Sequence, residues 1–226
     1  GEEVCSLGCS GGACLVCEVG ESRCTAAGLE HCEAPGLWGA PAACPGGCSE
    51  GACVTPAAAS CAVSGPGRSD CGPGGNEDCC TSILVPGGSF VQDNDLRYEA
   101  SVQTFRLDRF EVTVGRFRQF VAAMQAGWQP QAGEGKHLHL NGGDGLLERG
   151  TADVFESGWN PAWVLPADWN AALASGWSCN WTAQPGANEN KAMNCIHWQE
   201  AYAFCIWDGG FLPSEAEWNY AAAGGS

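Results

Sequence analysis

The sequence predicts a small disulfide-rich region at the N-terminus, followed by a larger domain of short amphipathic helices and long loops. Thirteen of the 16 cysteines lie in residues 1–80, where large apolar residues are few. Such a segment needs cross-links to hold a fold, because it cannot bury enough apolar surface. Further along, apolar side chains recur at helical spacing within 113–124 and 198–222.

The cysteine content also indicates where the protein works. Sixteen cysteines in 226 residues are typical of an oxidising compartment, because cytosolic thiols stay reduced. We therefore expect an extracytoplasmic location, whether secreted, periplasmic or at the cell surface. No apolar run reaches the roughly 18 residues of a membrane span. The net charge of −16 disfavours nucleic acid as a partner.

Residues 1–60 contain an internal repeat with a period of 39 residues. Cysteines 5, 9 and 14 return as cysteines 44, 48 and 53, with similar residues between them. The pair Cys14 and Cys17, near His31, has the spacing of zinc ligands, but no second C-x-x-C completes such a site. Disulfides are therefore favoured. The repeat would serve as a rigid stalk or would bind a surface partner or glycan.

Residues 61–82 are rich in Ala, Pro, Gly and Ser and are predicted to be a linker. After it, Thr113 is placed to cap a helix whose buried stripe has the spacing i, i+3, i+4, i+7. The stripe consists of Phe117, Phe120, Val121 and Met124.

A tryptophan-rich stretch follows this helix. Six tryptophans lie between residues 128 and 181, and they would either anchor loops to the core or line a groove for a peptide or sugar. The same stretch contains His137 and His139, which would face one side of a strand. These two histidines are weak candidates for a metal site, because a third ligand is needed to complete it.

The last 35 residues carry the clearest helix signals. Trp198, Tyr202, Cys205 and Ile206 recur at the spacing of one helix face, and the pair Gly209-Gly210 is suited to end that helix. Ser214 and Glu217 form a capping box at the start of a second helix, in which each side chain bonds the other residue's amide. The acidic residues here are expected to cap and pack rather than to catalyse.

These residues resemble the formylglycine-generating enzyme family, also called the sulfatase-modifying factor domain. The run Leu-Pro-Ser-Glu-Ala-Glu-Trp, from 212 to 218, is highly specific for that family. The resemblance extends over residues 83–226, and it includes a segment at 85–90 that resembles the family's opening strand and the segment Glu111-Val112-Thr113. This sequence departs from the family at Phe211 and His197, among other positions. The motif residues are Trp198, Cys205, Trp207, Pro213, Ser214, Glu215, Glu217 and Trp218.

The resemblance implies an α+β fold of irregular, C-type-lectin-like architecture, of which this chain would hold only the N-terminal part. It implies oxidation of a cysteine in a target protein or peptide to an aldehyde by dioxygen. The family uses copper(I), held by two thiolates that lie downstream of the motif, and it also binds calcium. No catalytic cysteine can therefore be assigned here. Glu111 is a weak catalytic candidate, with a structural role at least as favoured.

Three cysteines lie outside the N-terminal region. Cys179 and Cys195 flank one loop and are expected to pair with each other. Cys205 then lacks a partner, and the resemblance implies a bridge to a position further along the family domain.

Three functions follow as alternatives. The first is the copper-dependent oxidase, and the second is a related binding module for peptide or glycan that has lost catalysis. The third is a relative that forms sulfur–carbon bonds with non-haem iron, for which His137 and His139 would be poor ligands.

Overall fold

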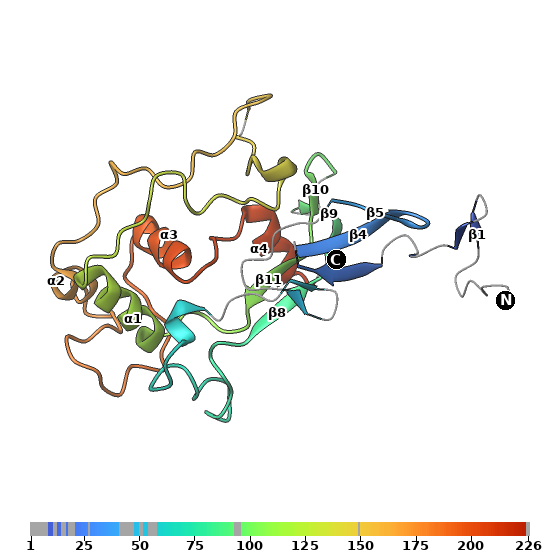
Figure 1. Ribbon diagram of the computed structural model, residues 1–226. Helices are drawn as coiled ribbons and strands as arrows, with labels where there is room; N and C mark the ends of the chain where they lie inside the picture. The colour runs from blue at the N-terminus through green and yellow to red at the C-terminus, as the bar shows by residue number, and fades with distance from the viewer. Residues whose placement is uncertain are drawn as a thin grey trace. The chain divides into compact units, whose positions relative to one another are not determined.

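The computed structural model describes residues 9–10, 13–14, 17, 21–26, 28–40, 48–49, 52–53, 58–92, 96–148 and 150–224. The chain divides into two compact units, Gly1–Ala57 and Ala58–Ser226. Each unit is described by itself. Both helices and antiparallel strands occur (Figure 1), so the mixed α+β class expected from the sequence is confirmed.

The first unit contains only strands among its described residues. Its sheet has the order β3 (Ser22–Thr25), β4 (Gly28–Ala34) and β5 (Leu37–Trp38), all antiparallel. A disulfide joins Cys17 to Cys32 of β4. Both sulfur-bearing residues are buried, so the cross-link occupies the place that a hydrophobic core would take.

The two copies of the sequence repeat form the same hairpin. In the first copy, β1 (Cys9–Ser10) pairs with β2 (Ala13–Cys14), and in the second, β6 (Cys48–Ser49) pairs with β7 (Ala52–Cys53). Each hairpin places its two cysteines opposite each other and its serine opposite an alanine. The cysteines at 5 and 44 lie outside the described residues. The repeat in sequence is thus also a repeat in strand pairing.

The second unit begins with the segment that the sequence predicted to be a linker. The structure includes 61–82 in this compact unit, with the short helix η1 (Ala59–Cys61) before it. Two disulfides, Cys61–Cys80 and Cys71–Cys79, cross-link the segment. A composition of small residues and proline therefore reflects tight packing here. For example, a Cβ on Gly67 would lie 2.7 Å from the Cα of Gly115.

Four strands follow in two separate antiparallel pairs. β8 (Ser82–Val85) pairs with β11 (Phe105–Asp108), and β9 (Gly88–Val91) pairs with β10 (Glu99–Val102). The single strand expected at 85–90 is therefore divided in two. Pro86 lacks an amide donor, and the amide of Gly87 donates to the Thr104 hydroxyl at 3.0 Å, so the ladder is interrupted at this dipeptide.

The helices are α1 (Val114–Gln125), α2 (Trp169–Leu173), α3 (Trp198–Trp207) and α4 (Glu215–Ala222), with the short η3 (Asn141–Gly143) in the long loop. The Thr113 hydroxyl accepts from the amide of Arg116 at 3.1 Å, as predicted for the helix cap. The predicted stripe of α1 is buried: Phe117, Phe120, Val121 and Met124.

An aromatic core joins α1, α2 and α3, which lie close together in Figure 1. Phe117 stacks on Phe204 with ring centroids 5.4 Å apart, and Phe120 meets Trp169 edge-on at 5.4 Å. A second, smaller cluster joins α4 to the strands. It consists of Phe90, Val102, Phe105 and Tyr220.

The end of α3 follows the prediction, but its buried face does not. Gly209 has φ = 86°, its amide donates to Ile206 O, and the amide of Gly210 donates to Cys205 O. This is the Schellman pattern of a helix terminus. Glu200 is buried, and its carboxylate accepts from the amide of His197 at 2.8 Å. Trp198, expected to be buried, is 54% exposed.

Candidate functional site

The turn between α3 and α4 carries the residues that are most specific in the sequence. The Ser214 hydroxyl accepts from the amide of Glu217 at 3.2 Å, and Glu217 Oε2 accepts from the amide of Ser214 at 2.7 Å. This reciprocal pair is a capping box. Pro213 lies in the turn and is partly buried, whereas Glu215 and Trp218 are exposed.

Glu217 also anchors a histidine from the long loop. His139 Nε2 lies 2.6 Å from Glu217 Oε1, and the Glu217 side chain is only 2% exposed. Burial by itself raises the pKa of Glu217. The hydrogen bonds from His139 and Ser214 outweigh that effect and lower the pKa to about 2. Glu217 is therefore a carboxylate at any ordinary pH.

A second histidine lies beside this pair. His137 Nδ1 is 2.9 Å from Glu156 Oε1, and His137 Nε2 is 2.7 Å from the carbonyl oxygen of Leu212. Phe211 contacts both histidine rings, with centroids 4.8 Å from His137 and 4.7 Å from His139. Phe211 thus packs on both imidazoles, whose own centroids lie 5.9 Å apart.

Glu156 is bound by main-chain amides as well as by the His137 ring. Glu156 Oε1 accepts from the main-chain amides of His137, at 2.6 Å, and of Leu146, at 2.9 Å. Burial opposes ionisation, but these two bonds and the His137 ring together lower the pKa of Glu156. Both ring nitrogens of His137 therefore face acceptor oxygens, those of the Glu156 carboxylate and the Leu212 carbonyl.

These contacts assign the two predicted metal candidates a structural role. Both ring nitrogens of His137 and the Nε2 of His139 are already hydrogen-bonded. The residues that the structure describes contain no group of three or more potential metal ligands. Sequence reasoning missed Glu156, because no helical or strand period links it to the histidines.

Glu111, the weak catalytic candidate, is exposed in a small notch of about 200 Å³. Asp70 and Asn190 also line this notch, and the Asn190 amide donates to the Asp70 carboxylate at 3.3 Å. Cys71 lines the notch as well, but its sulfur is bonded to that of Cys79. The notch thus holds two carboxyl groups, those of Glu111 and Asp70, without the free thiol or histidine that nucleophilic catalysis commonly uses.

Cys205 is the free cysteine among the described residues. Burial raises the pKa of its thiol to about 12, and the carboxylates of Asp208 and Asp108 add to the shift. At neutral pH it is therefore a protonated thiol, which is a poor nucleophile and a poor metal ligand. A copper(I) site of two thiolates does not fit the described residues, nor does a calcium site built from several carboxylates.

A buried arginine holds the environment of Cys205 together. Arg116 is 1% exposed and binds Asp208 at 2.8 Å, Asp108 at 2.6 Å and the Ser60 hydroxyl at 2.8 Å. Burial outweighs the attraction of Arg116 and raises the pKa of Asp108. Sequence patterns do not indicate this network, because Ser60 and Asp208 lie far from Arg116 along the chain.

A disulfide joins Cys179 to Cys195. Within the loop that it closes, the Asn180 amide donates to the carbonyl oxygen of Ala192 at 2.8 Å.

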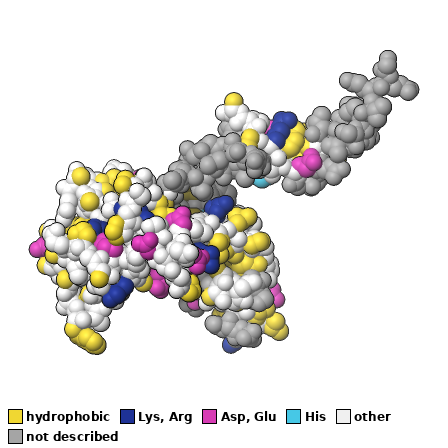
Figure 2. Space-filling model, turned by 90° about the horizontal axis from the view of Figure 1, so that it is seen from below, with side chains coloured by type: hydrophobic (Ala, Val, Ile, Leu, Met, Phe, Trp, Pro, Cys, Tyr) yellow, Lys and Arg dark blue, Asp and Glu magenta, His cyan; other side chains and the backbone are white. Residues whose placement is uncertain are grey.

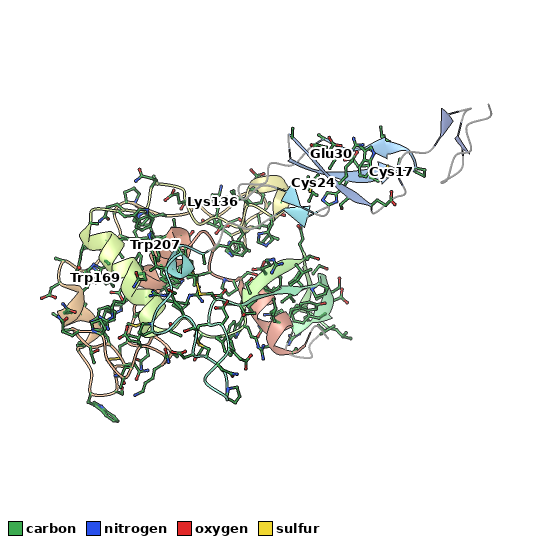
Figure 3. The ribbon with its side chains drawn as sticks, turned by 60° about the horizontal axis from the view of Figure 1, so that its bottom comes forward. Cys17, Cys24, Glu30, Lys136, Trp169 and Trp207 are labelled. Atoms are coloured by element: carbon green, nitrogen blue, oxygen red, sulfur yellow. A yellow bond between two sulfur atoms is a disulfide. The ribbon has the colours of Figure 1, made fainter. Side chains whose placement is uncertain are left out.

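Most of the tryptophans anchor this loop and its neighbours to the core, as the core-anchoring interpretation expects. Trp159, Trp169 and Trp181 are each 4% exposed, and Trp128 and Trp163 pack against the same core. Trp169 and Trp207 are labelled in Figure 3 on α2 and α3. Trp177 is the exception, since it is fully exposed.

No helix in the described part of the chain is long and apolar enough to cross a membrane. Figure 2 shows hydrophobic side chains in several separate patches on this face of the protein.

Known proteins resemble this chain over most of its length. Residues 68–226 match the family of sulfatase-modifying factor enzyme 1-like domains. The formylglycine-generating enzyme of Thermomonospora curvata is 32% identical over 161 residues, covering 63% of this chain and 48% of that protein. The bovine formylglycine-generating enzyme is 27% identical over 171 residues, covering 68% and 42%.

A further relative carries a different name. The mouse protein named inactive C-alpha-formylglycine-generating enzyme 2 is 28% identical over 161 residues, covering 63% of this chain and 47% of that protein. The chain thus spans about half the length of the curated relatives it matches. No solved structure matches. Since the family match covers more than half of the chain, this protein belongs to the sulfatase-modifying factor, or formylglycine-generating enzyme, family.

Proposed function

We propose that this chain is part of an oxidase of the formylglycine-generating type, which converts a cysteine of a target protein to an aldehyde with dioxygen. The observation that carries the proposal is the α3–α4 turn. There the motif residues Ser214 and Glu217 form a complete capping box within a family match that runs from residue 68 to 226. Family membership alone would not support it, because related folds carry different chemistries.

In this proposal the described residues supply the scaffold. The Arg116 network holds η1 and α1 against the end of α3. The contacts of His137 with the Leu212 carbonyl and of His139 with Glu217 hold the long loop against the start of α4. Copper, and any calcium, would be bound by residues in the part of the relatives that this chain does not cover. No reaction step is assigned to residues described here.

The target is proposed to be an extracytoplasmic protein or peptide. The disulfides in both units support an oxidising compartment, because such bonds do not persist in a reducing cytosol.

The test incubates the natural protein with a cysteine-containing peptide, copper(I), dioxygen and a thiol reductant. The peptide thiol leaves as sulfide and its carbon gains one oxygen atom, while the other oxygen atom leaves as water with two electrons from the reductant. Mass spectrometry and an aldehyde-trapping hydroxylamine would detect the product. An oxidase should require all three additions, and an unchanged peptide with every addition present would exclude this function.

A second candidate is a binding module of the same family without catalysis. One observation favours it: the relatives include proteins named inactive at similar identity. Binding of the target peptide with no aldehyde formed would support this candidate. Absence of both binding and oxidation would exclude the two together.

A further inference from the structure

The short helix η3 in the long loop contains the sequence Asn141-Gly142. Among the asparagines of the chain, Asn141 alone is followed by glycine. Both residues are exposed, and a Cβ on Gly142 would meet no atom within 4 Å. The pair is therefore open to water, and no neighbouring side chain shields it.

The main-chain nitrogen of Gly142 is placed to react with the side chain before it. That nitrogen can close a succinimide ring on Asn141 Cγ, and glycine hinders the closure least because it has no Cβ. Gly142 lies at the start of η3, where amides lack a partner within the helical turn. In the described part of the chain, no hydrogen bond uses this amide. The nucleophile is therefore free.

We propose that Asn141 is a site of spontaneous deamidation. In the first step the Gly142 nitrogen bonds to Asn141 Cγ, and Nδ2 leaves as ammonia with the proton of the Gly142 amide. Water then adds to either carbonyl carbon of the ring and breaks its bond to nitrogen, which leaves aspartate or isoaspartate. The reaction consumes only water, and the inference does not depend on the proposed oxidation.

The reaction removes a hydrogen bond that closes this turn. Asn141 Nδ2 donates to the carbonyl oxygen of Gly145 at 2.7 Å. A carboxylate only accepts, so the product would place one acceptor against another. Asn141 has φ = 49°, a conformation that asparagine and aspartate both tolerate. The aspartate form would thus keep the backbone of the turn but lose the bond, and isoaspartate would also lengthen the main chain.

The same turn supports the carboxylate of Glu156. Gly145 is buried with φ = 97°, and a Cβ there would lie 2.5 Å from Glu156 Oε1. The amide of Leu146 donates to this oxygen at 2.9 Å, and His137 Nδ1 lies 2.9 Å from it. Deamidation would therefore loosen the support of Glu156 and, through it, the contact with His137.

The chain contains a matched control for this site. Asn180 Nδ2 donates to the carbonyl oxygen of Ala192 at 2.8 Å, as Asn141 donates to Gly145, but the bulky Trp181 follows it. The full chain is incubated at neutral pH and, in parallel, at mildly acidic pH. Mass spectrometry of its peptides detects replacement of the amide by a carboxyl group. Protein isoaspartyl methyltransferase with labelled S-adenosylmethionine detects isoaspartate.

We expect conversion of Asn141 at neutral pH and an intact Asn180. Conversion should be slower at acidic pH, because the Gly142 amide must lose its proton to attack. Asn141→Gln should yield no methylated product, because the larger ring that glutamine would need closes far more slowly.

Hydrogen exchange measures the structural consequence. In the incubated protein and in Asn141→Asp, the Leu146 amide should exchange about 5-fold faster, as expected for the loss of one hydrogen bond between neutral groups. Amides of α1 should exchange at an unchanged rate and serve as the control for global stability.

An intact Asn141 after incubation, or equal conversion of Asn141 and Asn180, would overturn the assignment of the site. An unchanged rate at Leu146 in Asn141→Asp would contradict the support of Glu156 by this turn. Faster exchange throughout α1 would contradict it as well, because the effect would then be a general loss of stability.

Discussion

In the first unit, disulfides take the place that aromatic packing takes in the second. The buried hydrophobic residues described in Gly1–Ala57 are Cys17 and Cys32, which bond to each other. The second unit instead buries six phenylalanine and tryptophan side chains in one core with α1, α2 and α3 around it. A single chain can thus offset the conformational entropy lost on folding in two ways. Disulfides restrict the unfolded state, and a core removes apolar surface from water.

The second unit adds a feature that the first lacks among its described residues, a buried ionic network. Arg116 is fully enclosed and binds two aspartates and a serine hydroxyl. Such a network adds little net stability compared with apolar packing, but breaking it is costly. The predictions below test which of these means dominates in each unit.

The largest effect is expected in the aromatic core. Phe120→Ala removes a fully buried ring that contacts Phe117, Trp169 and Phe204, and should cost about 3 to 5 kcal/mol of unfolding free energy. Urea denaturation followed by tryptophan fluorescence measures it. Trp177→Ala, at a fully exposed position, is the control and should change stability by less than about 0.5 kcal/mol. Equal effects of the two substitutions would contradict the assignment of the core.

The buried network should give an effect nearly as large. Arg116→Met leaves the Asp208 carboxylate buried at 8% side-chain exposure without its partner, and should cost about 3 to 5 kcal/mol. The double variant Arg116→Met with Asp208→Leu should recover part of that loss, because it removes the orphaned charge. A double variant that is less stable than the single one would show that the network contributes more than charge pairing.

The first unit should depend on its cross-link. Replacing Cys17 and Cys32 by serine opens a disulfide with a sequence separation of 15, and should cost about 3 kcal/mol. Hydrogen exchange should then increase in β3 and β4 but not in α1 or α3. Loss of protection throughout the second unit as well would show that the two units do not fold independently.

Acid should weaken the contact between the long loop and α4. The folded-state pKa of Glu217 is about 2, below its ordinary value of 4.5. Its stabilising effect is therefore complete above about pH 4.5 and is lost as the pH falls through about 2. Glu217→Gln should lower stability at pH 7 and reduce the slope of unfolding free energy between pH 5 and pH 2. An unchanged slope would mean that other carboxylates account for the acid sensitivity.

The smallest effect is expected at the cap of α4. Ser214→Ala removes the hydroxyl that accepts from the amide of Glu217 at 3.2 Å and should cost about 1 kcal/mol. Ser214→Thr keeps the hydroxyl and is the matched control. Thermal unfolding measures the stability of both variants. Equal losses in the two would indicate a general sensitivity of this turn to substitution and would contradict the capping role.

The sequence by itself determined the local features of this protein. The stripe of α1, the glycine termination of α3 and the capping box of Ser214 and Glu217 each depend on residues within about ten positions of one another. Spacing and capping rules act over that range, so these features could be predicted without coordinates. The family, too, followed from a short specific run of residues.

Only the tertiary structure decided which distant residues meet. It brought Ser60 and Asp208 to Arg116, and Glu156 to His137, although no local rule relates those positions. Residues 61–82 also belong to the second unit, although large apolar residues are few there. Disulfides and close glycine contacts hold this segment in place. Long-range contacts of this kind depend on how loops close, and their free energy is not visible in any short stretch of sequence.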